Sequence, residues 1–200
     1  MLDVEVISDP AAAVSALDPI RSRLLAELTE PASAATLAGR VGIARQKVNY
    51  HLRALEEHRL VTEVGERQWG GLRERMLVAS ASSYVVSPAA LGPAAADPGR
   101  TADRMSASYL IAMAARAVRE VGDLWRRSRE QDKRLATLSI DTTITFRSAA
   151  QRAEFSRELS AAVLSLAARY HDEGNPRGRA HRVLLAAYPM PSQNPKEVAK

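Results

Sequence analysis

The sequence predicts an α+β protein in which an N-terminal unit of short helices and a β-hairpin precedes a long helix and a small α-β-α-β C-terminal module. Apolar residues recur at helical spacing over residues 19–58, and a stretch rich in Pro, Gly and Ala then interrupts periodic structure near residues 87–100. Helical and alternating patterns follow each other after this stretch. We therefore expect one domain over residues 1–88, a linker over 89–103 and a second domain over 104–200.

Three short helices are predicted in the N-terminal domain. They cover residues 19–29, 34–40 and 44–58. Asp18 followed by Pro19 is a typical helix start, because the carboxylate caps the first turn and proline needs no hydrogen-bond acceptor there. Ser33 caps the second helix in the same way, and Gly42 ends it. The third helix has an apolar stripe made by Val48 and the two leucines that follow it at helical spacing.

A hairpin and a C-terminal module complete the predicted elements. The hairpin strands cover residues 60–64 and 76–81, and a loop over 66–74 contains Gly70 and Gly71, which permit a tight reversal. The later elements are a long helix over 104–131, a strand over 138–146, a helix over 148–170 and a strand over 183–188. In the first of these strands, alternate residues from Leu138 to Phe146 are mostly apolar.

Two helices, a short turn, a third helix and a hairpin form the layout in which the third helix enters the major groove of DNA. With the apolar stripe of this helix buried, its opposite face carries Arg45, Gln46, Asn49, Tyr50 and Arg53. These side chains can donate to guanine, pair with adenine or bind phosphates. The alternative is a solvated polar face that contacts nothing.

The segment LDPIRSRLLAELTEPASAATLAGRVGIARQKVNYHLRALEEHRLVTEVGE, residues 17–66, resembles the winged helix-turn-helix domain of ArsR-like (arsenic-repressor-type) transcription regulators. Within it, VNYHLRALEEHRLV follows the TVSHHLxxLxxAGLV pattern of that family. The resemblance implies that the third helix faces DNA with the following residues: Arg45, Gln46, Lys47, Asn49, Tyr50 and Arg53. His51 falls on the HL pair of the pattern, and we interpret it as a structural, hydrogen-bonded residue.

The loop over residues 67–75 would then be the wing of this domain. Arg67 and Arg73 are its candidate DNA contacts, because guanidinium groups on such a loop can bind a phosphate backbone or enter a minor groove. Arg75 is a weaker candidate, because the return strand is predicted to begin at the next residue. The alternative is a basic loop without a ligand.

Composition excludes several classes of function. The chain has no cysteine, and its four histidines are scattered, so thiolate chemistry is impossible and we expect no metal site and no cofactor. This departs from the metal-sensing members of the family. The run His171, Asp172, Glu173 is interpreted as a polar helix end. No nucleophile-base pair, phosphate-binding glycine motif or paired carboxylate site stands out, so we expect no enzyme.

Charge and terminal sequence suggest an anionic partner and a cytoplasmic location. The net charge is +5, and it divides into −1 over residues 1–100 (11 Lys/Arg against 12 Asp/Glu) and +6 over 101–200 (17 against 11). Residues 1–13 contain acids but no Lys or Arg, unlike a signal peptide. No apolar run approaches the length of a membrane span, about 20 residues.

Together these observations predict a sequence-specific, DNA-binding transcription regulator. We expect a homodimeric repressor that pairs through the helix over 104–131 and responds to a small organic effector, rather than a metal, in the C-terminal domain. The arginines and lysine over 126–134 either reach the DNA flanks or form solvated surface. The alternative function is an architectural protein that binds DNA without regard to sequence.

Overall fold

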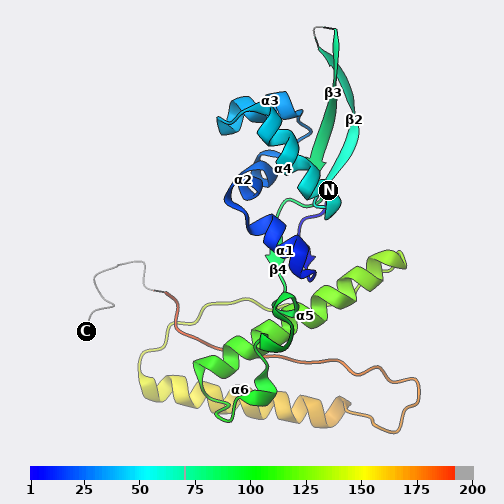
Figure 1. The fold of residues 1–200 in the computed structure, drawn as a ribbon. Coiled ribbons are helices and arrows are strands. Elements are labelled where there is room, and N and C mark those ends of the chain that lie inside the picture. Colours follow the sequence, from blue (N-terminus) through cyan, green and yellow to red (C-terminus); the bar gives the residue numbers. More distant parts are fainter. Residues whose placement is uncertain (70, 192–200) are drawn as a thin grey trace. The chain divides into compact units, whose positions relative to one another are not determined.

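The computed structural model describes residues 1–69 and 71–191 of the chain. These residues fall into two compact units, which divide between Leu135 and Ala136. The first unit carries every strand found in the described residues and the helices up to α5, and the second carries α6 (Figure 1). The α+β class is confirmed.

Four short helices open the first unit: α1 (Pro10–Leu17), α2 (Pro19–Glu27), α3 (Ala34–Val41) and α4 (Arg45–Glu57). The last three confirm the predicted helices, with ends that differ by at most two residues. Asp18 caps α2 by accepting hydrogen bonds from the amides of Ile20 and Arg21, at 2.9 and 3.0 Å. Ser33 caps α3 by accepting from the Thr36 amide at 3.2 Å. Gly42 ends α3 in the left-handed region, with φ of 71°.

The hairpin consists of β2 (Val61–Trp69) and β3 (Leu72–Ala79), which are antiparallel. The prediction placed both strands correctly but made them too short, because most of the expected loop over 66–74 is strand. The antiparallel ladder continues to the pair Trp69 and Leu72, well beyond the predicted strand ends. Gly71 lies at a φ of 82°, and Gly70 lies outside the described residues.

A second, two-stranded parallel sheet is formed by β1 (Glu5–Ile7) and β4 (Tyr84–Val86). Neither strand was predicted, and each has only three residues, too few to show an alternating pattern. The sheet joins the N-terminus of the chain to the segment that follows the hairpin.

One hydrophobic core unites α1 to α4, the base of the hairpin and β1. Its most completely buried large side chains include Leu24, Leu28, Leu37, Val48 and Leu55, none of which is measurably exposed. Full burial of such a side chain contributes about 1.5–3 kcal/mol relative to exposure. The inward stripe predicted for residues 44–58 is confirmed.

The expected linker is partly structured and leads into a helix that belongs to the first unit. It contains two 3₁₀ helices, η1 (Pro88–Ala94) and η2 (Pro98–Arg100), and both contact α5 (Ala107–Glu130). Ala95 and Pro98 are buried. The first compact unit extends through α5 to Leu135, whereas the domain boundary expected from the sequence lies at residue 104.

In the second unit, α6 (Ala149–Tyr170) confirms the predicted helix. The two flanking strands predicted over 138–146 and 183–188 are wrong as assigned secondary structure: both segments are extended chain without a ladder. Alternation of apolar side chains reports which faces are apolar, whereas a strand also requires a neighbour for its backbone hydrogen bonds. Of the predicted α-β-α-β module only the two helices are present, and no sheet forms within its described residues.

Candidate nucleic-acid interface

The α4 helix separates an apolar face from a polar one. Val48, Leu52 and Leu55 are buried in the core, which fixes the rotation of the helix about its axis. All six side chains that the sequence predicted for its outer face are exposed: Arg45, Gln46, Lys47, Asn49, Tyr50 and Arg53. Tyr50 is 68% exposed although it is large and aromatic. The helix therefore presents cations, amides and a phenol on one surface.

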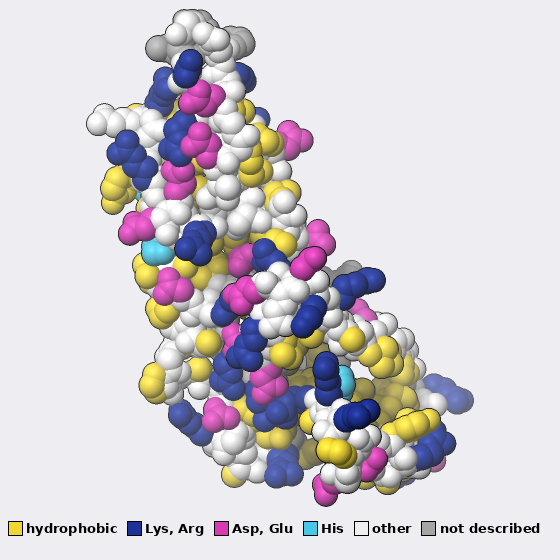
Figure 2. Space-filling model, turned by 90° about the vertical axis from the view of Figure 1, so that its right-hand side faces the viewer, with side chains coloured by type: hydrophobic (Ala, Val, Ile, Leu, Met, Phe, Trp, Pro, Cys, Tyr) yellow, Lys and Arg dark blue, Asp and Glu magenta, His cyan; other side chains and the backbone are white. Residues whose placement is uncertain are grey.

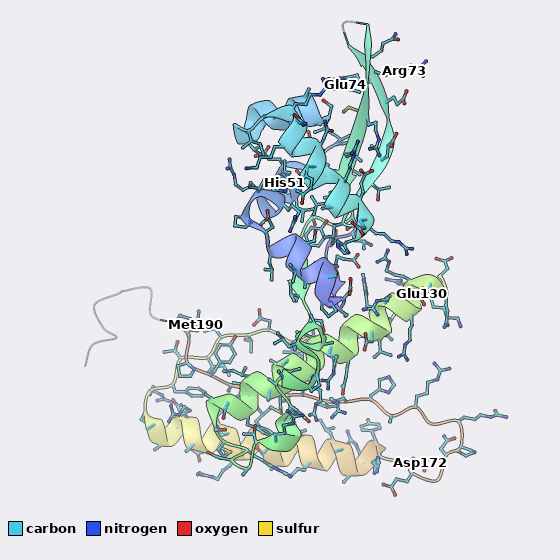
Figure 3. The ribbon with its side chains drawn as sticks, in the orientation of Figure 1. His51, Arg73, Glu74, Glu130, Asp172 and Met190 are labelled. Carbon is cyan, nitrogen blue, oxygen red and sulfur yellow. The ribbon has the colours of Figure 1, made fainter. Side chains whose placement is uncertain are left out.

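Glu74 on β3 joins this helix to the hairpin. Its carboxylate lies 3.9 Å from a guanidinium nitrogen of Arg45 and 3.2 Å from one of Arg67. Glu74 is buried, and a hydrogen bond from the Ser33 hydroxyl is the largest cause that lowers the pKa of its carboxyl. Burial opposes this shift, while a hydrogen bond from Arg67 and the charges of Arg45 and Arg67 add to it. The structure thus brings one predicted helix residue and one predicted wing residue to the carboxylate of Glu74. Figure 3 labels Glu74 on the hairpin.

The other arginines of the hairpin are placed differently. Arg73 is 79% exposed in its side chain and lies 3.6 Å from the Glu66 carboxylate on the opposite strand. Arg75 contacts Glu56 of α4, and its Nε donates to Glu63 at 2.7 Å. Acidic and basic side chains are consequently interleaved along the hairpin surface (Figure 2). Arg73 is therefore more available to an external ligand than Arg75.

His51 is buried in α4 and makes no hydrogen bond within the part of the chain that the structure describes. This corrects the expectation of a hydrogen-bonded histidine, although its packed position agrees with a structural role. Burial lowers the pKa of His51, and the positive charges of Arg21 and Lys47 lower it further, while Asp18 opposes them. The imidazole is therefore held neutral beneath the exposed face, with its ring edge-on to Tyr50 at 5.3 Å between centroids.

Sequence reasoning did not identify Glu74 as part of the site. The triplet Arg73, Glu74, Arg75 could have indicated its position. In a strand, side chains alternate between the two faces, so Glu74 points to the face opposite the two arginines. That this face contacts α3 and α4 depends on packing across residues distant in the sequence. Thr36 is a further neighbour, 3.5 Å from a nitrogen of Arg67.

The arrangement of cations and amides on α4 and the hairpin can bind a polyanion. The described residues contain no group of three His, Asp or Glu side chains that could hold a metal ion. None of the helices in the ranges 1–69 and 71–191 is long and apolar enough to cross a membrane. What the surface does offer is a helix with exposed donors beside a hairpin with cationic side chains.

Comparison with known proteins agrees with this geometry. Residues 16–64 match the family model described as a helix-turn-helix domain, a family that includes ArsR-type domains. The match runs from the end of α1 through α4 into β2, about a quarter of the chain. No curated protein matches the chain. Residues 16–64 are a helix-turn-helix DNA-binding domain.

Proposed function

We propose that this protein is a sequence-specific transcription regulator of the ArsR-like type, which binds an operator as a homodimer and represses transcription. The helix-turn-helix domain supports a DNA-binding regulator. The proposal adds that the protein is a dimer, that named residues contact the bases, and that binding represses transcription. The observation that carries it is the exposed polar face of α4, fixed outward by the burial of Val48, Leu52 and Leu55. We also propose that it acts in the cytoplasm, where it would meet its DNA ligand.

Two groups of residues divide the work of binding in this proposal. Gln46 and Asn49 have paired donor and acceptor groups suited to adenine, and Arg45 has a guanidinium group suited to guanine. Phosphates are bound by Lys47 and Arg53 of α4 and by Arg67 and Arg73 of the hairpin. Tyr50 lies on the same exposed face of α4. The side chains of the α4 residues are exposed in the free protein, so no refolding is needed before contact.

Dimerisation through α5 is supported by its exposed apolar face. Ile111, Val121 and Trp125 are 65, 48 and 41% exposed, and Ala114 and Val118 complete spacings of three and four residues between them. This spacing is that of a helix-pairing seam. A neighbouring side of α5 contacts β1, where Gly122 is buried against Val6. The apolar spacing of this helix in the sequence predicts a stripe made by Leu110, Ala114, Ala117, Val121 and Leu124, and the seam shares Ala114 and Val121 with it.

We further propose that a small organic effector, rather than a metal, controls binding. A hollow of about 1070 Å³ in the first unit supports this proposal; it lies among β1, the start of α1, the end of α4, the hairpin base and the end of α5. Its lining combines apolar residues such as Val6 with the charged pair Glu5 and Arg129, 3.6 Å apart. A ligand that separates this pair would shift α5 relative to the DNA-binding domain, and hence the spacing of the two recognition helices in a dimer.

The test begins with an operator selected from random duplexes by the purified protein, followed by titration of alanine variants on that operator and on a random duplex. Arg45→Ala, Gln46→Ala and Asn49→Ala should each cost about 1–3 kcal/mol on the operator and relax preference at one base position. Replacement of Lys47 or Arg73 should weaken binding to both duplexes and lower the slope of log K against log salt by about one unit per lost phosphate contact.

Arg169→Ala is the matched control, because Arg169 lies on α6 outside the helix-turn-helix domain and its guanidinium is 4.8 Å from the Tyr170 ring centroid. It should leave both affinities unchanged. If the three reading residues can be replaced together with operator affinity retained within about twofold, in a protein that still folds, α4 is not the reader and the proposal fails. Selection of no preferred sequence would instead support an architectural DNA-binding protein.

A further inference from the structure

The second unit exposes almost all of its apolar residues. Not one residue among 136–191 is buried, and Leu138, Ile140 and Val183 are 87, 79 and 74% exposed. A unit that buries so little apolar surface cannot offset the conformational entropy lost on ordering its chain. The ordered form of this unit therefore requires a surface that covers it.

The internal arrangement of the unit shows which part lacks a partner. The extended segments over 138–146 and 183–191 flank α6 in the chain and run in the same direction, as strands joined by a helical crossover do (Figure 1). The Thr143 hydroxyl lies 3.8 Å from the Met190 sulfur, so the two segments approach each other at this point. Phe146 contacts Phe155 of α6, with ring centroids 5.3 Å apart, so the end of the first segment lies against the helix.

A strand has two hydrogen-bonding edges, and the segment over 183–191 can pair with only one edge of the segment over 138–146. The other edge of the segment over 138–146 remains unpaired even when the segment over 183–191 pairs with the first edge. An open edge beside exposed apolar side chains is a surface on which another strand can pair. The question is which strand matches it.

We propose that the segment over 138–146 pairs with the same segment of a second copy of this chain, antiparallel and with a two-fold axis at Thr142. In this register Leu138 lies opposite Phe146 of the second copy, Ile140 lies opposite Ile144, and Thr142 lies opposite its own counterpart. Every apolar side chain of the segment thus faces an apolar one, and threonine faces threonine, both favourable cross-strand pairs. The pattern is complementary to itself, as an isologous two-fold interface requires.

Neighbouring registers match less well. An axis at Asp141 sets the two Asp141 carboxylates opposite each other and pairs Ile140 with Thr142. An axis at Thr143 pairs Ile144 with Thr142 and leaves Leu138 opposite Ser148. An axis between two residues sets the apolar face of one copy against the polar face of the other. With the axis at Thr142, the only charged residue of the segment, Asp141, lies opposite Thr143.

Charge and pattern therefore favour a second copy over an unrelated protein as the occupant. The proposal is independent of DNA binding and uses a surface different from the α5 seam. A dimer held by both surfaces would join its two chains at α5 and again at a continuous sheet.

Site-directed disulfide formation tests this proposal directly, because the chain contains no cysteine of its own. In the proposed register the two copies of residue 142 have Cβ atoms about 4.5–5.5 Å apart, close to the separation that a disulfide accepts. Thr142→Cys in the full-length protein, oxidised with copper phenanthroline, should therefore give a covalent dimer on a non-reducing gel that dithiothreitol reverses.

Ser139→Cys is the matched control. Its counterpart in the second copy is displaced by six residues along the strand, about 20 Å at the usual strand rise. Thr142→Cys should cross-link at least about tenfold faster than Ser139→Cys. Equal rates, or no cross-linking of either variant in protein that circular dichroism shows to be folded, would overturn the proposal. Faster cross-linking of Asp141→Cys or Thr143→Cys would overturn the register and with it the proposal as stated.

A second pair of variants separates strand pairing from mere proximity. Ile140→Lys in the Thr142→Cys background sets a cation against the apolar Ile144 of the second copy and should slow cross-linking at least about tenfold. Thr143→Lys sets a cation opposite Asp141 on the polar face and should leave the rate unchanged or raise it. Equal effects of the two lysines would contradict pairing at this edge.

Discussion

Gly122 of α5 offers a quantitative test of how this helix is held against the DNA-binding domain. A Cβ atom added at Gly122 would lie 2.7 Å from Cγ1 of Val6 in β1, well inside ordinary contact. Gly122→Ala should gain about 1 kcal/mol of helix propensity and lose about 1–3 kcal/mol to overpacking. The net change is thus between no effect and a loss of about 2 kcal/mol in the free energy of unfolding.

Gly39 of α3 provides the matched control, because an added Cβ there meets no atom within 4 Å. Gly39→Ala should stabilise the protein by about 0.5–1 kcal/mol, as measured by urea denaturation followed by circular dichroism. Val6→Ala removes the clashing methyl groups, so its effect should be less unfavourable in the Gly122→Ala background than in the native one. If Gly122→Ala stabilises as much as Gly39→Ala and shows no coupling to Val6→Ala, α5 does not pack on β1 as described.

Three further predictions concern the interface. Because the pKa of His51 is lowered, the unfolded chain binds the proton more readily, so the free energy of unfolding should fall as the pH drops below about 6.5, and His51→Leu should reduce this dependence in urea titrations at several pH values. Glu74→Gln should tighten DNA binding about two- to fivefold in fluorescence anisotropy, since Arg45 and Arg67 no longer share a carboxylate; unchanged or weaker binding would mean that Glu74 positions them instead. Asp18→Ala should cost about 1 kcal/mol of thermal stability through loss of the α2 cap, and a change below about 0.3 kcal/mol would contradict that role.

The N-terminal domain was predictable because its determinants are local. The helix starts at Asp18 and Ser33, the helix end at Gly42 and the apolar spacing of Val48 and Leu52 each act within a few residues. They placed α2, α3 and α4 to within two residues and assigned the exposed face of α4 correctly. The resemblance over residues 17–66 coincides with the segment that matches the helix-turn-helix family model.

What the sequence by itself determined is therefore the pattern of each element: where helices begin and end, and which of their faces are apolar. Tertiary structure decided which elements and side chains contact one another. Glu74 meets Arg45 because β3 packs beside α3 and α4, and it meets Arg67 because the hairpin register sets the two residues opposite each other. α5 joins the first unit because it contacts η1 and η2 and because Gly122 admits Val6. The segment over 138–146 has the side-chain alternation of a strand yet forms none, because a ladder depends on a second backbone at the right distance, which no local pattern supplies.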